Sequence, residues 1–327
     1  MNMRNVLVYA VLAASAGIAQ CQGPRLTPAG AVTVRAESAN PRIPVWSGNA
    51  LLSIEGPATG PNAFVAYSPA GDVLLNAAFS IDGADQTLVL NWDRGVDGSL
   101  ALCGTSFDRD GRAAPFIGWI SADGASQRMI RTEPFTPHLI AVAADGSFWA
   151  VGRNLNSHRG ERGVDLDAGV LRHFDQSGRP LGAYLPRSGF KNSVELSNNH
   201  GRLRALKDGV AWLHYLGSGD GSYTEISSRG DITNYPIPRL PKEESDVVKI
   251  GGMAVTAAGD VFVSMHLVGN LPGGSLFWLD RSKRGWLPVT LPPGAAGAYL
   301  FGLKGNDLVL QLIGDSPSTF RFYSVMW

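Results

Sequence analysis

The sequence feature that most constrains the fold is a pair of β-hairpins that recurs about every 50 residues. Each unit holds an inner and an outer hairpin, made of short runs of β-branched and aromatic residues joined by turns rich in Gly, Asp and Ser. The outer turns end at positions spaced by 52 to 54 residues, namely Gly71, Gly124, Gly178, Gly230 and Arg284. A sixth copy begins at Phe320 and stops at Trp327, before its returning strand.

Four strands per unit at this period predict an all-β fold, a six-bladed β-propeller with four antiparallel strands in each blade. The sixth unit lacks one strand, and the run Ala31–Ala36 precedes the first blade without a partner of its own. We therefore expect this N-terminal strand to pair with Phe320–Met326 and to close the ring. Closure would remove two exposed sheet edges, which are templates for aggregation.

The first 19 residues have the features of a secretory signal peptide. Arg4 supplies a positive charge, Val6–Ala19 is apolar, and small residues precede the expected cleavage site. This run is shorter than the roughly 20 residues that cross a bilayer, and we expect no transmembrane segment. The sequence predicts a signal peptide over residues 1–19, a linker over 20–30 and a single propeller domain over 31–327, in a secreted or periplasmic protein.

Cys21 leaves an alternative open for the localisation. The sequence Ile18-Ala-Gln-Cys21 resembles the lipobox of lipoproteins, although Gln20 stands where Gly, Ala or Ser is expected. A lipoprotein anchored through Cys21 is therefore the alternative to a freely secreted or periplasmic protein.

The charge balance bears on the partners that the protein can bind. The chain has 28 basic and 28 acidic residues, and charged residues make up 17% of it. This balance argues against general electrostatic binding to nucleic acid or to an anionic membrane, because both need an excess of positive charge. We expect a monomer that binds a protein or a small polar ligand, and no nucleic acid.

Candidate binding residues gather in the connections that a propeller places around the mouth of its channel. These connections enter the innermost strands or join the second and third strands, and four of the six histidines fall in or beside them. Neutral imidazole can bind a metal or act as a general base. Two long connections, 153–169 and 187–202, add further polar residues. The predicted ligand-binding set is His138, Arg153, Asn154, His158, Asn199, His200 and His266, and no residue is assigned a catalytic role.

One stretch resembles a known repeat. Pro137-His-Leu-Ile-Ala-Val-Ala-Ala-Asp-Gly-Ser-Phe-Trp-Ala-Val151 is similar to the repeat of NHL-type six-bladed propellers, a superfamily shared with SMP-30/gluconolactonase-like hydrolases and streptogramin-lyase-type propellers. The resemblance implies the fold across residues 30–327. It implies activity less directly, because one fold hosts many functions.

The motifs of these enzymes are matched only in part. SMP-30-like hydrolases resemble one another in a Glu-Gly-Pro near the first blade, followed by Asn and Asp ligands for a divalent ion. Glu55-Gly56-Pro57 is present, but the repeat places it after the second strand of the first unit, and no later Pro-Asn-Asp-Gly occurs. We interpret it as a turn. A lyase would need a histidine and an acid at the mouth, and the candidates are His138 or His200 with Glu161 or Glu195.

The sequence therefore favours a non-catalytic binding or interaction scaffold that engages a ligand or protein at the channel-mouth face, with no cofactor predicted. The alternative is a metal-dependent hydrolase, lactonase-like, or a lyase, with its site at the same mouth and calcium or zinc as the candidate ion. An enzyme of that kind would need at least three ligand-type side chains that converge on one point.

Overall fold

The computed structural model covers the 327 residues of the chain. It describes residues 23–33, 42–55, 62–154, 168–190, 201–215, 221–238, 247–268, 274–312, 315 and 319–327. Within this part of the chain, no helix is long and apolar enough to cross a membrane.

Strands account for nearly all of the regular structure in these ranges. In chain order they are β1 (Arg25–Thr33), β2 (Arg42–Ser47), β3 (Ala50–Glu55), β4 (Asn62–Tyr67), β5 (Val73–Phe79), β6 (Gln86–Arg94), β7 (Leu100–Phe107), β8 (Ala113–Ile120), β9 (Gln127–Arg131), β10 (Phe135–Val142), β11 (Phe148–Asn154), β12 (Gly169–Phe174), β13 (Pro180–Pro186), β14 (Gly201–Leu206), β15 (Gly209–Tyr215), β16 (Gly221–Ile226), β17 (Ile232–Pro236), β18 (Val247–Val255), β19 (Val261–Val268), β20 (Gly274–Asp280), β21 (Gly285–Pro288), β22 (Tyr299–Lys304), β23 (Asp307–Gln311) and β24 (Thr319–Met326). A short 3₁₀ helix, η1 (Arg187–Gly189), follows β13.

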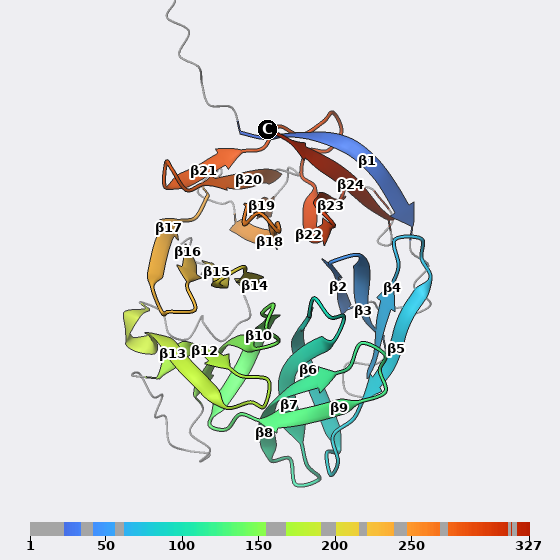
Figure 1. Ribbon diagram of the computed structural model, residues 1–327, viewed down its shortest axis with the longest axis vertical. Helices are drawn as coiled ribbons and strands as arrows, with labels where there is room; N and C mark the ends of the chain where they lie inside the picture. The colour runs from blue at the N-terminus through green and yellow to red at the C-terminus, as the bar shows by residue number, and fades with distance from the viewer. Residues whose placement is uncertain are drawn as a thin grey trace, which may run out of the picture.

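The strands form sheets that stand around a common axis (Figure 1). Four sheets have four strands each, in the orders β6–β9, β10–β13, β14–β17 and β18–β21, and one has eight, in the order β1-β24-β23-β22-β2-β3-β4-β5. In Figure 1 the strands β2, β6, β10, β14, β18 and β22 lie innermost, while β5, β9, β13, β17 and β21 lie at the periphery. The predicted all-β fold with antiparallel four-stranded sheets, a β-propeller, is confirmed at this level.

The N-terminal strand pairs with the last strand of the chain. β1 and β24 are antiparallel, from Arg25 opposite Met326 to Thr33 opposite Thr319. The strand begins six residues before the predicted run, inside the expected linker 20–30, because a register shift between Pro28 and Gly30 accommodates residues that usually interrupt strands. Leu26 is buried, which ties this early segment to the core.

The inner strands contact one another through close backbone approaches and through polar side chains. β2 and β22 meet in a single parallel bridge, Trp46 opposite Gly302. A side chain on Gly302 would overlap the carbonyl oxygen of Trp46, so only glycine permits this approach. Between β6 and β10, the carboxylate of Asp93 accepts a hydrogen bond from the backbone N–H of Val142 at 3.0 Å. The hydrophobic core lies between neighbouring sheets, as where Leu213 of β15 packs with Met265 of β19.

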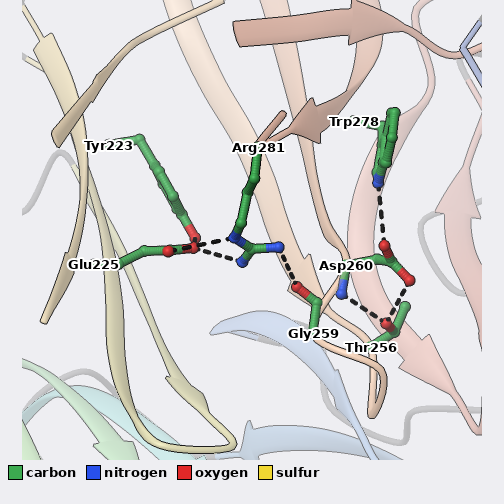
Figure 2. Close-up of polar contacts among 7 residues, drawn as sticks. All are labelled: Tyr223, Glu225, Thr256, Gly259, Asp260, Trp278 and Arg281. Carbon is green, nitrogen blue, oxygen red and sulfur yellow. Dashed lines mark hydrogen bonds and ion pairs between the residues drawn. The ribbon is translucent and has the colours of Figure 1, made fainter. Parts of the chain in front are cut away.

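The ring has two ends that differ in their connections. We call the end formed by the first and third turns of each sheet the hairpin-turn end, and the end where the inner strands begin the mouth end. At the hairpin-turn end (Figure 2), Arg281 donates hydrogen bonds to Glu225 at 2.6 Å and to the carbonyl of Gly259 at 2.9 Å. Tyr223 donates to the same carboxylate at 2.8 Å, and Trp278 donates to Asp260 at 3.3 Å. The contact between Arg281 and Glu225 connects the β14–β17 and β18–β21 sheets.

Candidate functional site

The structure describes four of the seven predicted ligand-binding residues. His138 lies in β10, Arg153 and Asn154 end β11, and His266 lies in β19, two residues before its end. All four are therefore near the mouth end, although the histidines lie inside strands and are buried. The others, together with the two candidate acids, lie outside the described residues: His158, Asn199, His200, Glu161 and Glu195.

His138 is placed by a β-bulge in the inner strand. The register of β10 against β11 shifts between Pro137 and Leu139, so His138 is the extra residue of the bulge. Bulges occur beside active sites, where they redirect a side chain. The facing strand carries Gly152, at which a Cβ would overlap the carbonyl oxygen of Thr136. The bulge and the glycine opposite it therefore form one local structure that presents His138.

Two arginines lie close enough to His138 to act on it electrostatically. Burial, followed by the charges of Arg153 and Arg187, lowers the pKa of His138 to about 4. The imidazole is therefore neutral at physiological pH. The side chain is 8% exposed, and its Nε2 atom has no hydrogen-bond partner among the described residues. A buried ring nitrogen in this state is available to a ligand at the mouth end.

The two arginines come from different elements. Arg153 lies near the end of β11, and Arg187 begins η1, where its backbone N–H donates to the carbonyl of Ala168 at 3.2 Å. Burial lowers the pKa of Arg153, while burial and then the charge of Arg153 lower that of Arg187. Arginine nevertheless remains charged in proteins. Arg153 and Arg187 thus place positive charge near the neutral imidazole of His138. We call these three residues the His138 cluster.

Asn154 is adjacent to Arg153 in sequence but serves another face of the sheet. Successive strand residues point to opposite faces. The side-chain oxygen of Asn154 accepts a hydrogen bond from Arg172 at 2.7 Å, and the guanidinium of Arg172 lies 4.4 Å from the ring centre of Phe135. The side-chain oxygen of Asn154 therefore contacts the neighbouring strand β12 and not the His138 cluster.

His266 has a similar environment in a different sheet. Its ring stacks on Tyr299 with the centroids 3.8 Å apart, and burial lowers its pKa to about 4. His214 lies in β15, in the sheet between these two, and burial also lowers its pKa to about 4. The pairing of His214 with Gly201, the first residue of β14, places it at the mouth end. Three neutral histidines therefore lie near the mouth, each in a different sheet.

The described residues at this end do not fit a divalent cation beside His138. Within the described ranges, no group of three or more His, Cys, Asp or Glu side chains is arranged to hold a metal ion. The groups that act on His138 are cationic and would repel calcium or zinc. Glu55 ends β3, the second of the four consecutive strands β2–β5, and accepts a hydrogen bond from Tyr67 at 2.5 Å. We therefore derive no step through a metal at the His138 cluster.

Positive charge continues along the inner strand β14. Arg202 donates to the carbonyl of Gly251 at 2.8 Å, and burial followed by the charge of Arg204 lowers its pKa to about 10. Burial raises the pKa of Asp93, an effect that the charge of Arg204 opposes. β14 thus carries two arginines, and the charge of one, Arg204, acts on the buried carboxyl group of Asp93.

Comparison with known proteins gives solved structures but no family. No family model matches the chain, and no curated protein matches it. A gluconolactonase from Xanthomonas campestris is 16% identical, with 94% of this chain and 96% of that chain covered at a TM-score of 0.48. The soluble aldose sugar dehydrogenase from Escherichia coli, in its apo form, is 9% identical, with 90% and 98% covered at a TM-score of 0.47.

Both of these similar structures belong to enzymes. This finding contradicts the prediction of a non-catalytic binding scaffold. At these identities and TM-scores the likeness assigns no reaction, so the activity has to be argued from the residues of this chain.

Proposed function

We propose that the chain is a propeller enzyme of the lactonase-like kind, a hydrolase or lyase, whose reaction takes place at the channel mouth beside His138. The observation that carries this proposal is a buried, neutral imidazole with an available ring nitrogen beside two guanidinium groups. A base and a nearby positive charge are the two elements that hydrolysis and elimination share, because both reactions remove a proton and build up negative charge on oxygen.

In hydrolysis, His138 would accept a proton from water as the water oxygen attacks the carbonyl carbon of a lactone or ester. Arg153 and Arg187 would stabilise the negative oxygen that forms, and the proton on His138 would pass to the alcohol oxygen as the acyl–oxygen bond breaks. A pKa of about 4 makes the imidazole a weak base in the free protein. The developing negative charge would offset the two arginines and so raise its basicity.

In elimination, the same imidazole would take a proton from the carbon next to a carboxylate. The electron pair left on that carbon would form a double bond as the leaving group departs with the electrons of its bond to the adjacent carbon. The arginines would make the proton more acidic by offsetting the charge on the carboxylate. Both reactions assign the same role to His138, so one variant tests the two.

The number of blades and the closure of the ring are also proposals. We propose six blades of the NHL/SMP-30-like type, because the eight-stranded sheet divides at the single bridge between β2 and β22 into two groups of four strands. Pairing of β1 with β24 supports closure of the ring by the N-terminal strand. We further propose a signal peptide over residues 1–19, a single domain over 31–327 joined by β1, and a secreted or periplasmic monomer that acts on a small polar ligand.

The proposal is tested by activity measurements on the purified mature protein. A panel of sugar lactones, esters and glycosides is assayed for acid release, and a panel of uronate-containing glycosides for the absorbance of an unsaturated product. We expect turnover in one of these assays and a loss of about 100-fold or more in His138→Gln. His173→Gln is the matched control, because His173 is a buried histidine of the same sheet that contacts Ser147 at the hairpin-turn end. Absence of turnover in both panels, or equal activity in His138→Gln and the wild type, would refute the proposal.

A further inference from the structure

The arginines of the His138 cluster differ from those that pair with acids elsewhere in the described chain. Arg321 contacts Asp315 at 2.8 Å, and this carboxylate raises the pKa of the arginine. Burial lowers the pKa of Arg281, but the hydrogen bonds and charge of Glu225 outweigh it, so the net pKa is raised. The pKa of Arg153 is lowered instead, with burial as its cause. No carboxylate of the described residues offsets the charge of Arg153.

The geometry of the cluster adds atoms that are ready to bind. The Nε atom of Arg153 is buried and has no hydrogen-bond partner within the described chain, and the same holds for Nε2 of His138. His138 is more than nine-tenths buried. The charge of Arg153 also acts on Arg187, so two like charges are held near each other in a partly desolvated place. The partly buried charge of Arg153 is unfavourable without a negative counter-charge, and a bound anion would offset it.

We propose that the substrate carries a carboxylate group, which Arg153 binds beside His138. This inference rests on the proposed function and narrows its substrate class to lactones, esters or glycosides of organic acids such as acidic sugars. Guanidinium groups suit a carboxylate because their parallel N–H donors match its two oxygens. Neutral sugars lack the charge that the cluster offsets. A phosphate shares the anionic chemistry, so the test includes one.

Binding is measured separately from turnover, by calorimetric titration with D-glucuronate, D-glucose 6-phosphate and D-glucose as probes. We expect D-glucuronate to bind the wild type, D-glucose not to bind, and the affinity for D-glucuronate to fall at least about tenfold in Arg153→Gln. Arg153→Lys keeps the charge but loses the forked donors, so it should lie between the wild type and Arg153→Gln. Arg229→Gln, at an exposed turn of the hairpin-turn end, is the control and should bind normally.

A second readout follows His138 itself by NMR. Binding of D-glucuronate should raise the pKa of His138, because the carboxylate offsets the charges that lower it. His138→Gln should keep its affinity for D-glucuronate within about threefold while losing turnover. Binding with no turnover in the wild type would sink the proposed function and leave the carboxylate inference standing. Turnover that is unchanged in Arg153→Gln would refute the carboxylate inference and leave the proposed function standing.

Three results would overturn the inference directly: no binding of D-glucuronate, equal binding of D-glucuronate and D-glucose, or unchanged affinity in Arg153→Gln. Preference for D-glucose 6-phosphate over D-glucuronate would also overturn it, since it would indicate a phosphate-bearing substrate. Because Arg153 ends a strand near the surface and is partly exposed, its replacement is expected to leave the fold intact. A thermal melt of each variant checks this.

Discussion

The Asp145 and Glu225 contacts at the hairpin-turn end and the His138 cluster at the mouth end differ in how their polar side chains are satisfied. At the hairpin-turn end, Asp145 accepts hydrogen bonds from both the N–H and the hydroxyl of Ser147, and Glu225 accepts from Tyr223 and Arg281. At the mouth end, His138 has a buried ring nitrogen without a partner in the described chain. Buried polar groups are normally satisfied, so those that are not call for an explanation. The difference agrees with the proposal that a ligand binds beside His138.

Arg281 and the arginines of the His138 cluster differ in the same way. Arg281 lies against a carboxylate that raises its pKa, whereas Arg153 and Arg187 lie near each other and near a neutral histidine. A strained or unsatisfied site is retained where function requires it, at some expense to stability. Variants at the mouth should therefore change activity more than stability, and variants at the hairpin-turn end should do the reverse.

Acid should destabilise the mouth end most strongly. Burial is the largest cause that lowers the pKa of His138, His214 and His266 to about 4, below the ordinary value of 6.5. The folded state favours the neutral forms, so this contribution to stability is complete above pH 6.5 and is lost as the pH falls toward 4. The shift corresponds to roughly 3 kcal/mol for each histidine.

Urea unfolding at about pH 7.5 and about pH 4.5 measures this loss. The double variant His214→Leu/His266→Leu should lose less stability between these two pH values than the wild type does, because it removes two of the groups that take up protons on unfolding. A wild-type unfolding free energy that is the same at both values would show that these histidines are not held neutral by the fold.

Replacing His138 should separate activity from stability. We expect His138→Gln to lower kcat/KM by about 100-fold or more, which is about 2.7 kcal/mol in transition-state stabilisation. Its melting temperature should change little, since a buried ring without a partner in the described chain is replaced by a smaller amide. His173→Gln should keep its kcat/KM. A similar loss of activity in both variants would indicate a general structural effect.

Weakening the Glu225 contacts drawn in Figure 2 should lower stability and leave activity unchanged. Glu225→Gln weakens the acceptor for Tyr223 and Arg281, and we expect a loss of about 1 to 2 kcal/mol in the unfolding free energy with turnover unchanged. The estimate is modest because the Arg281 side chain is 39% exposed. A double-mutant cycle with Arg281→Met measures the coupling. A coupling of zero would remove this contact from the account of stability.

Removal of divalent metal should have the smallest effect. The described groups that act on His138 are positive, so we expect kcat/KM to stay within about twofold after treatment with EDTA and gel filtration. Elemental analysis of the treated protein confirms that metal is gone. Activity that disappears with EDTA and returns with calcium or zinc would place the reaction elsewhere in the chain.

The repeat could be predicted because its turns depend on local sequence. Gly71, Gly124, Gly178 and Gly230 all have positive φ, between 73° and 94°, a conformation that glycine adopts without strain. At the fifth outer turn, Arg284 stands at the position of these glycines, and it also has a positive φ, 51°. The early start of β1 could not be predicted in this way. Pro28 and Gly30 are residues typical of a linker, and only the pairing with β24 shows that they belong to a strand.

The site was predictable only in part, because it depends on contacts between elements. Placing His138 and Arg153 near the mouth followed from the order of strands in the repeat. The bulge at His138 depends on the register between β10 and β11, and the approach of Arg187 depends on η1, neither of which a single strand pattern reveals. Gly152 opposite the bulge was the available local signal, since glycine inside a strand often marks such a site.

The most direct test of the account is the pKa of His138, measured by NMR titration of its ring proton in the wild type and in Arg153→Gln. The account predicts a value of about 4 in the wild type and a higher value in the variant, because one of the two charges that lower it has been removed. A wild-type value near the ordinary 6.5, or one that Arg153→Gln leaves unchanged, would contradict the existence of the His138 cluster and with it the proposed site.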